Sequence, residues 1–387
     1  MLVQPLGLLA LMAGVVYSKK CYNLTLPIHV TARNGNFSSL STPETNLDAT
    51  MFALAATRQG SNGTEKVLTG YSSVSGHYHI SAQYCMPNSA EINAPTLQVL
   101  THGVGFDKTY WDLPYNNYNY SYVDYALSRG FHTFAYDRLG IGNSSHGDPK
   151  NEIQAFLEIE ALAEMTRLLR NGSVPGIREI PGKIAHVGHS FGSGLTYALS
   201  AKYPNLSDGI VLTGFSMNAT FLPYFIAGAN FQQARLNLSP DVLSKTGRQY
   251  SPGYLTIADK GNNEYIFFSP PYFDPEILVF GEMIKQPVTV GELLTLGSLP
   301  KMSSFTGSVL IVCGSNDLPF CGGDCLATGS RLDSIPAAAN VAFPSAKSFS
   351  AVIQPNTGHG LNLHYNATGG YKQIADFLDS QVSLIKP

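Results

Sequence analysis

Residues 183–201, KIAHVGHSFGSGLTYALSA, restrict the possible folds of this chain more than any other stretch. A short apolar run typical of a buried strand leads into Gly-His-Ser-Phe-Gly at residues 188–192, and a helical sequence follows. A serine between two glycines at such a strand-to-helix turn holds its hydroxyl outward on a strained backbone. The glycines leave room where a Cβ would collide with a crossing element. We therefore interpret Ser190 as a candidate nucleophile, the alternative being a chance Gly-x-Ser-x-Gly.

Apolar strand-like runs alternate with helical patterns along most of the 387 residues. Three β-rich segments come first and are expected to form antiparallel leading strands: 22–30, 50–56 and 76–84. Buried strands follow at 97–101, 131–136, 183–187, 209–214, 309–313 and 349–353, and helices near 123–128, 153–170 and 371–385. This alternation predicts an α/β fold, a mostly parallel mixed sheet with helices on both faces.

The alternation stops between residues 215 and 300, a stretch too long for a loop inside a compact domain. Its aromatic clusters include Phe221, Tyr224 and Phe268. We interpret it as an inserted, mainly helical cap or lid with an aromatic underside, and an additional core segment is the alternative. The predicted organisation is a signal peptide at 1–18, a core in two parts at 19–214 and 301–387, and the cap at 215–300.

The N-terminus is predicted to direct the chain into the secretory pathway. Residues 6–16 are apolar but too few to cross a bilayer, and residues 16–18 suit cleavage after Ser18. The first residues lack Lys and Arg, so a buried strand or an uncleaved membrane anchor is the alternative. Ten asparagines lie in Asn-x-Ser/Thr sequons, against roughly four expected by chance. They are Asn23, Asn36, Asn62, Asn119, Asn143, Asn171, Asn205, Asn218, Asn237 and Asn366. We expect a secreted or lumenal glycoprotein.

In that compartment, five cysteines predict two disulfides and one free thiol. Cys21 and Cys85 lie in extended segments that a bridge would join, and Cys321 and Cys325 would close a tight loop. Cys313, inside an apolar strand-like run, is the expected buried thiol. A zinc site is the weaker alternative because a single Cys-x₃-Cys has no partner pair.

Polar residues follow four of the predicted strands: His102, Ser190, Asp317 and His359. Ligands of open parallel sheets bind at the carboxyl ends of the strands. A serine hydroxyl needs an imidazole to accept its proton, and the resulting imidazolium needs a carboxylate. Ser190, His359 and Asp317 supply these groups in the chain order expected of this architecture.

The oxyanion formed in acyl transfer needs preorganised hydrogen-bond donors. The backbone N–H groups of Phe191 and of Val104, in the loop that His102 and Gly103 open, are the candidates.

With these motifs the chain resembles the serine-nucleophile α/β-hydrolases, of the secreted or secretory-pathway type with an inserted cap. The resemblance runs from about residue 96 to the C-terminus. It rests on LTHG at 100–103, DRLGIGNS at 137–144, GHSFG at 188–192, GSND at 314–317 and GH at 358–359. It implies Ser190 as nucleophile, Asp317 as acid and His359 as base. Epoxide hydrolases and haloalkane dehalogenases of this fold carry an aspartate where Ser190 stands, so the resemblance favours carboxylic-ester-type substrates.

The aromatic cap predicts a small hydrophobic ester or lactone as substrate, contacted by His102, Gly103, Phe221, Tyr224 and Phe268. No metal or organic cofactor is expected. A net charge of −3 favours neither nucleic acid nor an anionic membrane, so membrane contact is expected only if the N-terminal segment is retained. Two alternatives stay open: a tailoring hydrolase that opens a lactone or epoxide of a natural product, and a non-catalytic secreted binding protein of the same fold.

Two other histidines lie near the expected site. His364 is the alternative base, five residues beyond His359. His189 is expected to point away from Ser190.

Overall fold

The computed structural model describes residues 19–60, 63–88, 96–178, 180–246 and 250–383. The predicted signal peptide at 1–18 and the sequon at Asn62 lie outside these ranges. Within them, no helix combines the length and apolarity needed to cross a bilayer. The other nine sequon asparagines are exposed or half-buried, which keeps glycosylation a prediction compatible with the fold.

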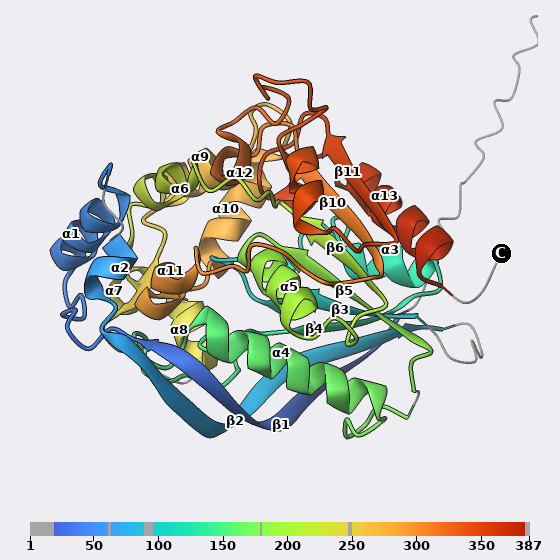
Figure 1. Ribbon diagram of the computed structural model, residues 1–387, viewed down its shortest axis with the longest axis horizontal. Helices are drawn as coiled ribbons and strands as arrows, with labels where there is room; N and C mark the ends of the chain where they lie inside the picture. The colour runs from blue at the N-terminus through green and yellow to red at the C-terminus, as the bar shows by residue number, and fades with distance from the viewer. Residues whose placement is uncertain (1–18, 61–62, 89–95, 179, 247–249, 384–387) are drawn as a thin grey trace, which may run out of the picture.

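An eight-stranded sheet with the order β1-β2-β4-β3-β5-β6-β10-β11 forms the centre of the molecule (Figure 1). Its strands are β1 (Lys19–Asn36), β2 (Gly70–Pro87), β3 (Thr96–Thr101), β4 (His132–Tyr136), β5 (Lys183–His189), β6 (Gly209–Thr213), β10 (Ser308–Gly314) and β11 (Ser348–Gln354). The first two pairings, β1 with β2 and β2 with β4, are antiparallel. All the others are parallel, so their carboxyl ends meet at one edge.

Helices cover both faces of this sheet (Figure 1). On one face α4 (Ala155–Arg170) packs against α5 (Phe191–Lys202), and on the other α3 (Tyr122–Ser128) packs against α13 (Ala367–Gln381). Strands β3 to β6 and β10 are buried along nearly their whole length because helices lie above and below them. The predicted α/β fold class is therefore confirmed. Short 3₁₀ turns η1 (Lys108–Tyr110), η2 (Pro336–Ala342) and η3 (Leu361–Leu363) lie between these elements.

The prediction of a strand at 50–56 is wrong, because this segment belongs to helix α1 (Asn46–Thr57). Thr45 and Asp48 form a capping box that starts the helix, and alanines favour its continuation. Helix α2 (Gly63–Val67) follows before β2 begins. The leader is thus a long β1–β2 hairpin with two helices in its connection. A disulfide between Cys21 and Cys85, with an S–S distance of 2.03 Å, joins its strands.

Residues 215–300 hold short helices and a small three-stranded sheet, β7-β8-β9. In chain order the elements are α6 (Leu222–Ala229), β7 (Gln232–Gln233), α7 (Ala234–Asn237), α8 (Pro240–Thr246), β8 (Tyr254–Thr256), α9 (Lys260–Phe267), α10 (Pro275–Ile284), β9 (Val288–Thr289) and α11 (Val290–Thr295). Helix α1 packs against α6 and β7, so the leader touches this segment (Figure 1).

Candidate active site

Ser190 occupies the turn between β5 and α5 with a φ of 55° and a ψ of −118°. This positive φ is costly for a residue with a side chain, and surrounding structure must hold it in place. A Cβ on Gly188 would overlap the backbone of Gly192, and a Cβ on Gly192 would overlap the carbonyl oxygens of Thr101 and His102. The two glycines therefore let α5 begin directly against the end of β3.

The sheet brings three distant residues together at the carboxyl ends of its strands. Ser190 Oγ lies 2.8 Å from Nε2 of His359, and Nδ1 of His359 lies 2.7 Å from Oδ2 of Asp317. Asp317 follows β10 and His359 follows β11, and both are fully buried. With Nδ1–H donating to the carboxylate, Nε2 is free to accept the serine proton.

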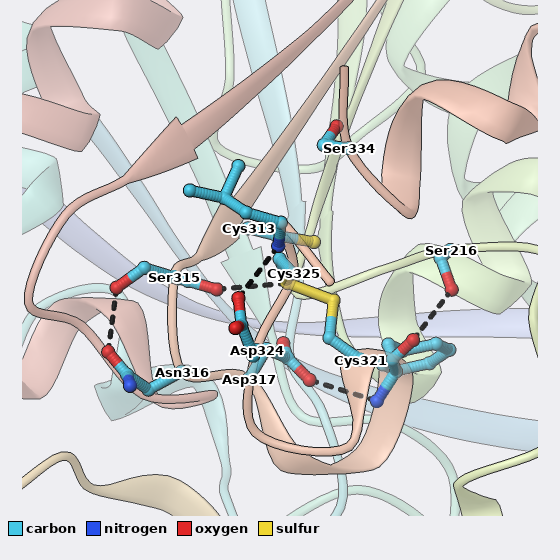
Figure 2. Close-up of a disulfide and its surroundings, with 12 residues drawn as sticks. Ser216, Cys313, Ser315, Asn316, Asp317, Cys321, Asp324, Cys325 and Ser334 are labelled. Atoms are coloured by element: carbon cyan, nitrogen blue, oxygen red, sulfur yellow. Dashed lines mark hydrogen bonds between the residues drawn. A yellow bond between two sulfur atoms is a disulfide. The ribbon is translucent and has the colours of Figure 1, made fainter. Parts of the chain in front are cut away.

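The loop after β10 is closed by a disulfide between Cys321 and Cys325, with an S–S distance of 1.99 Å (Figure 2). Helix α12 (Leu318–Cys321) begins at Asp317, whose Oδ1 accepts the Phe320 N–H at 2.9 Å. The N–H of Cys325 donates to the Ser315 carbonyl at 2.9 Å. The disulfide and these backbone hydrogen bonds together hold Asp317 in place against His359.

His364, the alternative base, holds the His359 loop instead. Its Nε2 accepts the N–H groups of Ser269 and Gly358, each at 3.0 Å, so Nδ1–H donates to the Gly360 carbonyl at 3.0 Å. Burial lowers the pKa of His364 to about 4. A neutral ring with both nitrogens engaged has no capacity left to accept a proton from serine.

His189 was expected to point away from Ser190, and its ring stacks on Tyr110 at 4.4 Å and lies 5.0 Å from the ring of His359. Nδ1 of His189 lies 3.2 Å from the Thr213 hydroxyl. Burial, and then the neighbouring rings of His359 and His102, hold the pKa of His189 well below its usual range. His189 therefore stays neutral and places no charge beside His359.

The loop after β3 passes close to Ser190. A Cβ on Gly103 would lie 2.9 Å from the Cβ of Ser190, so only glycine permits this approach. Val104 follows in the same loop. Phe191 is the first residue of α5, and the first N–H groups of a helix have no acceptor within the helix.

His102, which was predicted to contact the substrate, anchors this loop and is not among the residues that line the pocket beside Ser190. Its Nε2 accepts the N–H of Arg138 at 3.0 Å, so Nδ1–H donates to the Gly103 carbonyl at 2.9 Å. Burial, and then the charge of Arg138, keep the pKa of His102 well below its usual range. The guanidinium of Arg138 is itself buried between Glu158 and Glu292, and it lies 4.7 Å from the ring of Phe191.

A pocket of about 150 Å³ opens beside Ser190. Its apolar wall comes from Phe191, Met217, Leu222, Leu296, Leu299 and Phe320, and the exposed Lys301 also borders it. The three aromatic residues predicted to line it do not do so. Phe268 packs against Phe273 and His364 in the core, Tyr224 is half exposed, and Phe221 lies against Tyr224 and Gly322.

In the residues that the structure describes, no three His, Cys, Asp or Glu side chains gather closely enough to hold a metal ion. Cys313 is free and buried, and its sulfur lies 3.1 Å from the backbone of Phe215.

The strand order of the sheet and the strand-to-helix turn at Ser190 are those of the α/β-hydrolase fold. The sequence profile of the alpha/beta hydrolase family matches residues 98–368. The chain belongs to the alpha/beta hydrolase family. No curated protein matches it in sequence.

Among solved structures, Rv0554 of Mycobacterium tuberculosis is 16% identical with a TM-score of 0.50, covering 80% of this chain and 96% of that one. A thermophilic esterase of Thermogutta terrifontis is 13% identical with a TM-score of 0.48, covering 80% and 96%. Epoxide hydrolase A of Mycobacterium thermoresistibile is 15% identical with a TM-score of 0.47, covering 79% and 95%.

Proposed function

We propose that this protein is a serine hydrolase that cleaves carboxylic-ester-type bonds of hydrophobic substrates through an acyl-enzyme. The observation that carries the proposal is the continuous hydrogen-bonded series from Ser190 through His359 to Asp317. Membership of the alpha/beta hydrolase family supports a hydrolytic reaction.

In the first half of the reaction, Ser190 Oγ attacks the ester carbonyl carbon while its proton passes to Nε2 of His359. The backbone N–H groups of Phe191 and Val104 stabilise the oxyanion of the tetrahedral intermediate. His359 then protonates the departing alcohol, and the acyl group stays on Ser190. Asp317 keeps its charge throughout and stabilises the imidazolium.

In the second half, water takes the place of the alcohol. His359 accepts a proton from this water, which attacks the acyl-enzyme carbonyl and releases the acid. The neutral rings of His189 and His364 leave His359 as the group that changes charge, because burial disfavours a proton on either of them.

The apolar wall of the pocket supports a hydrophobic substrate such as a small ester or lactone. A serine in place of an aspartate speaks against direct attack on an epoxide, because the two nucleophiles form different covalent intermediates.

Labelling with a fluorophosphonate probe and hydrolysis of p-nitrophenyl acetate test this function on the purified full-length protein. We expect Ser190→Ala to abolish labelling and to lower kcat by about 10⁴-fold or more. Ser73→Ala is the control, because Ser73 is exposed on β2 and belongs to none of the ten sequons. Wild-type protein that neither reacts with the probe nor hydrolyses the ester would contradict the serine-hydrolase function and favour the binding-protein alternative. Epoxide hydrolysis that survives Ser190→Ala would establish a reaction without the serine nucleophile.

A further inference from the structure

A second cavity of about 580 Å³ adjoins the pocket at Ser190. Ala219, Leu222, Leu296 and Gly297 line both spaces, so one set of side chains forms the border between them. The two spaces are therefore neighbouring parts of one apolar region that begins at the nucleophile.

The far wall of the large cavity comes from the leader. Phe52 and Ala56 of α1 and Val67 of α2 face Ile226 of α6 and Leu293 of α11 across it. Figure 1 shows α1 and α2 in blue beside these later helices. The leader helices precede residue 98, where the match to the family begins. This wall therefore lies outside the part of the chain that the family profile matches.

The side chains that line the cavity are almost all apolar. No charged side chain lines it in the described part of the chain, and the one hydroxyl belongs to Thr64. That hydroxyl donates to the Leu294 carbonyl at 3.1 Å, which ties α2 to α11. This lining favours an apolar ligand group, because a charged group against it would lose hydration and meet no charged side chain among the described residues. The volume falls within the roughly 300–1,000 Å³ of small-molecule sites.

We propose that this cavity binds a long hydrocarbon chain of the ester substrate while the ester carbonyl lies at Ser190. The proposal rests on the serine-hydrolase function proposed above and narrows its substrates to long-chain lipid-like esters. This hydrocarbon chain is part of either the acyl group or the alcohol of the ester, and in both cases it makes the same apolar contacts inside the cavity. Each methylene moved from water into such a site raises kcat/KM by up to about fourfold.

Two series of esters determine whether the hydrocarbon chain in the cavity belongs to the acyl group or to the alcohol. In the first, p-nitrophenyl esters run from acetate to dodecanoate; in the second, acetate esters run from ethanol to dodecanol. We expect kcat/KM to rise steeply with length in one series. A rise in the first places the acyl group in the cavity, and a rise in the second places the alcohol there. Flat profiles in both series overturn the proposal.

Ala56→Trp is the test of the site itself, because Ala56 is half-buried and lines the large cavity but not the Ser190 pocket. We expect it to lower kcat/KM for the longest ester by about tenfold or more, and for p-nitrophenyl acetate by less than about twofold. Leu54→Trp is the matched control, because Leu54 is 65% exposed on the same helix. An unchanged length profile in Ala56→Trp overturns the proposal.

The outcomes separate this proposal from the proposed function. A wild-type protein that hydrolyses no ester in either series contradicts the serine-hydrolase function itself. Hydrolysis of short esters without length dependence leaves that function intact and rejects the cavity as a chain site. If Ala56→Trp loses acetate hydrolysis or melts early, the smaller Ala56→Phe replaces it, and the same reduction for long esters alone is required.

Discussion

Ser190 shows how closely backbone geometry and chemistry are coupled at the level of single residues. Its φ of 55° is a conformation that side chains disfavour. The neighbouring glycines make it possible because they let α5, β3 and the loop at Gly103 approach one another without side chains between them. This tight packing holds the Ser190 hydroxyl within hydrogen-bond distance of His359.

We expect Gly192→Ala to lower the free energy of unfolding by about 3 kcal/mol or more, because its Cβ would overlap backbone oxygens that cannot move independently. Gly194→Ala is the matched control on the same helix. There the new Cβ meets Leu299 at 3.5 Å, an ordinary contact, and the helix gains about 0.5–1 kcal/mol from alanine. Urea unfolding of both variants measures the difference. Equal stabilities would show that the crowding at Gly192 is relieved by a backbone shift.

At the level of elements, the loop after β10 determines where the carboxylate of Asp317 lies. Hydrogen bonds from the N–H groups of Cys321 and Gly323 to the Asp317 carbonyl fold this loop back on itself. The Cys321–Cys325 bridge then closes it (Figure 2).

Removing that bridge with Cys321→Ser/Cys325→Ser is expected to lower kcat by about tenfold, because small displacements of catalytic groups are costly and a 1 Å shift costs about 100-fold. Both cysteines are replaced together so that no single thiol remains to pair with Cys313. The control is Cys21→Ser/Cys85→Ser, whose bridge joins β1 to β2. It should lower the melting temperature and leave kcat within about twofold. Ester hydrolysis and thermal melting measure both effects, and an unchanged kcat in the first variant would contradict a positioning role for the bridge.

Across the whole molecule, several buried histidines are held neutral by the fold. His186 is one of them, and its ring nitrogens contact the hydroxyls of Thr166 at 2.9 Å and Ser207 at 2.5 Å. Burial lowers the pKa of His186 to about 3. Between about pH 6.5 and 3 the unfolded chain therefore binds a proton at this position that the folded chain excludes. The contribution of His186 to the free energy of unfolding is therefore fully present above about pH 6.5 and is lost as the pH falls toward 3.

Each pH unit within this interval costs about 1.4 kcal/mol per histidine, so His186 alone is expected to cost about 2 kcal/mol at pH 5. His186→Gln removes the titrating group, and the loss in unfolding free energy between pH 7.5 and pH 5 should shrink by that amount. His29→Gln is the control, because His29 is exposed on β1. Urea unfolding at both pH values measures the change. The same pH dependence in wild-type protein and His186→Gln would contradict a neutral His186 in the folded state.

Spacing along the chain is enough to predict the α/β class, the serine at its turn and the histidine and aspartate that accompany it. Such residues follow buried strands, and parallel strands end at one edge of a sheet, so their order along the chain already implies a common site. Local patterns were less reliable where a segment suits both strand and helix. The pattern of residues 50–56 predicted a strand, but the segment is helical because Thr45 and Asp48 cap it.

The tertiary structure alone decided which side chains surround the serine. Phe221, Tyr224 and Phe268 do not line the pocket, because Phe221 and Tyr224 lie against each other and Phe268 packs on Phe273 and His364. The leader helices α1 and α2 instead line a cavity beside the pocket. The direction of a side chain depends on contacts between elements far apart in the chain, which no local pattern records. The partners of buried polar groups, such as the two glutamates around Arg138, follow from the same long-range packing.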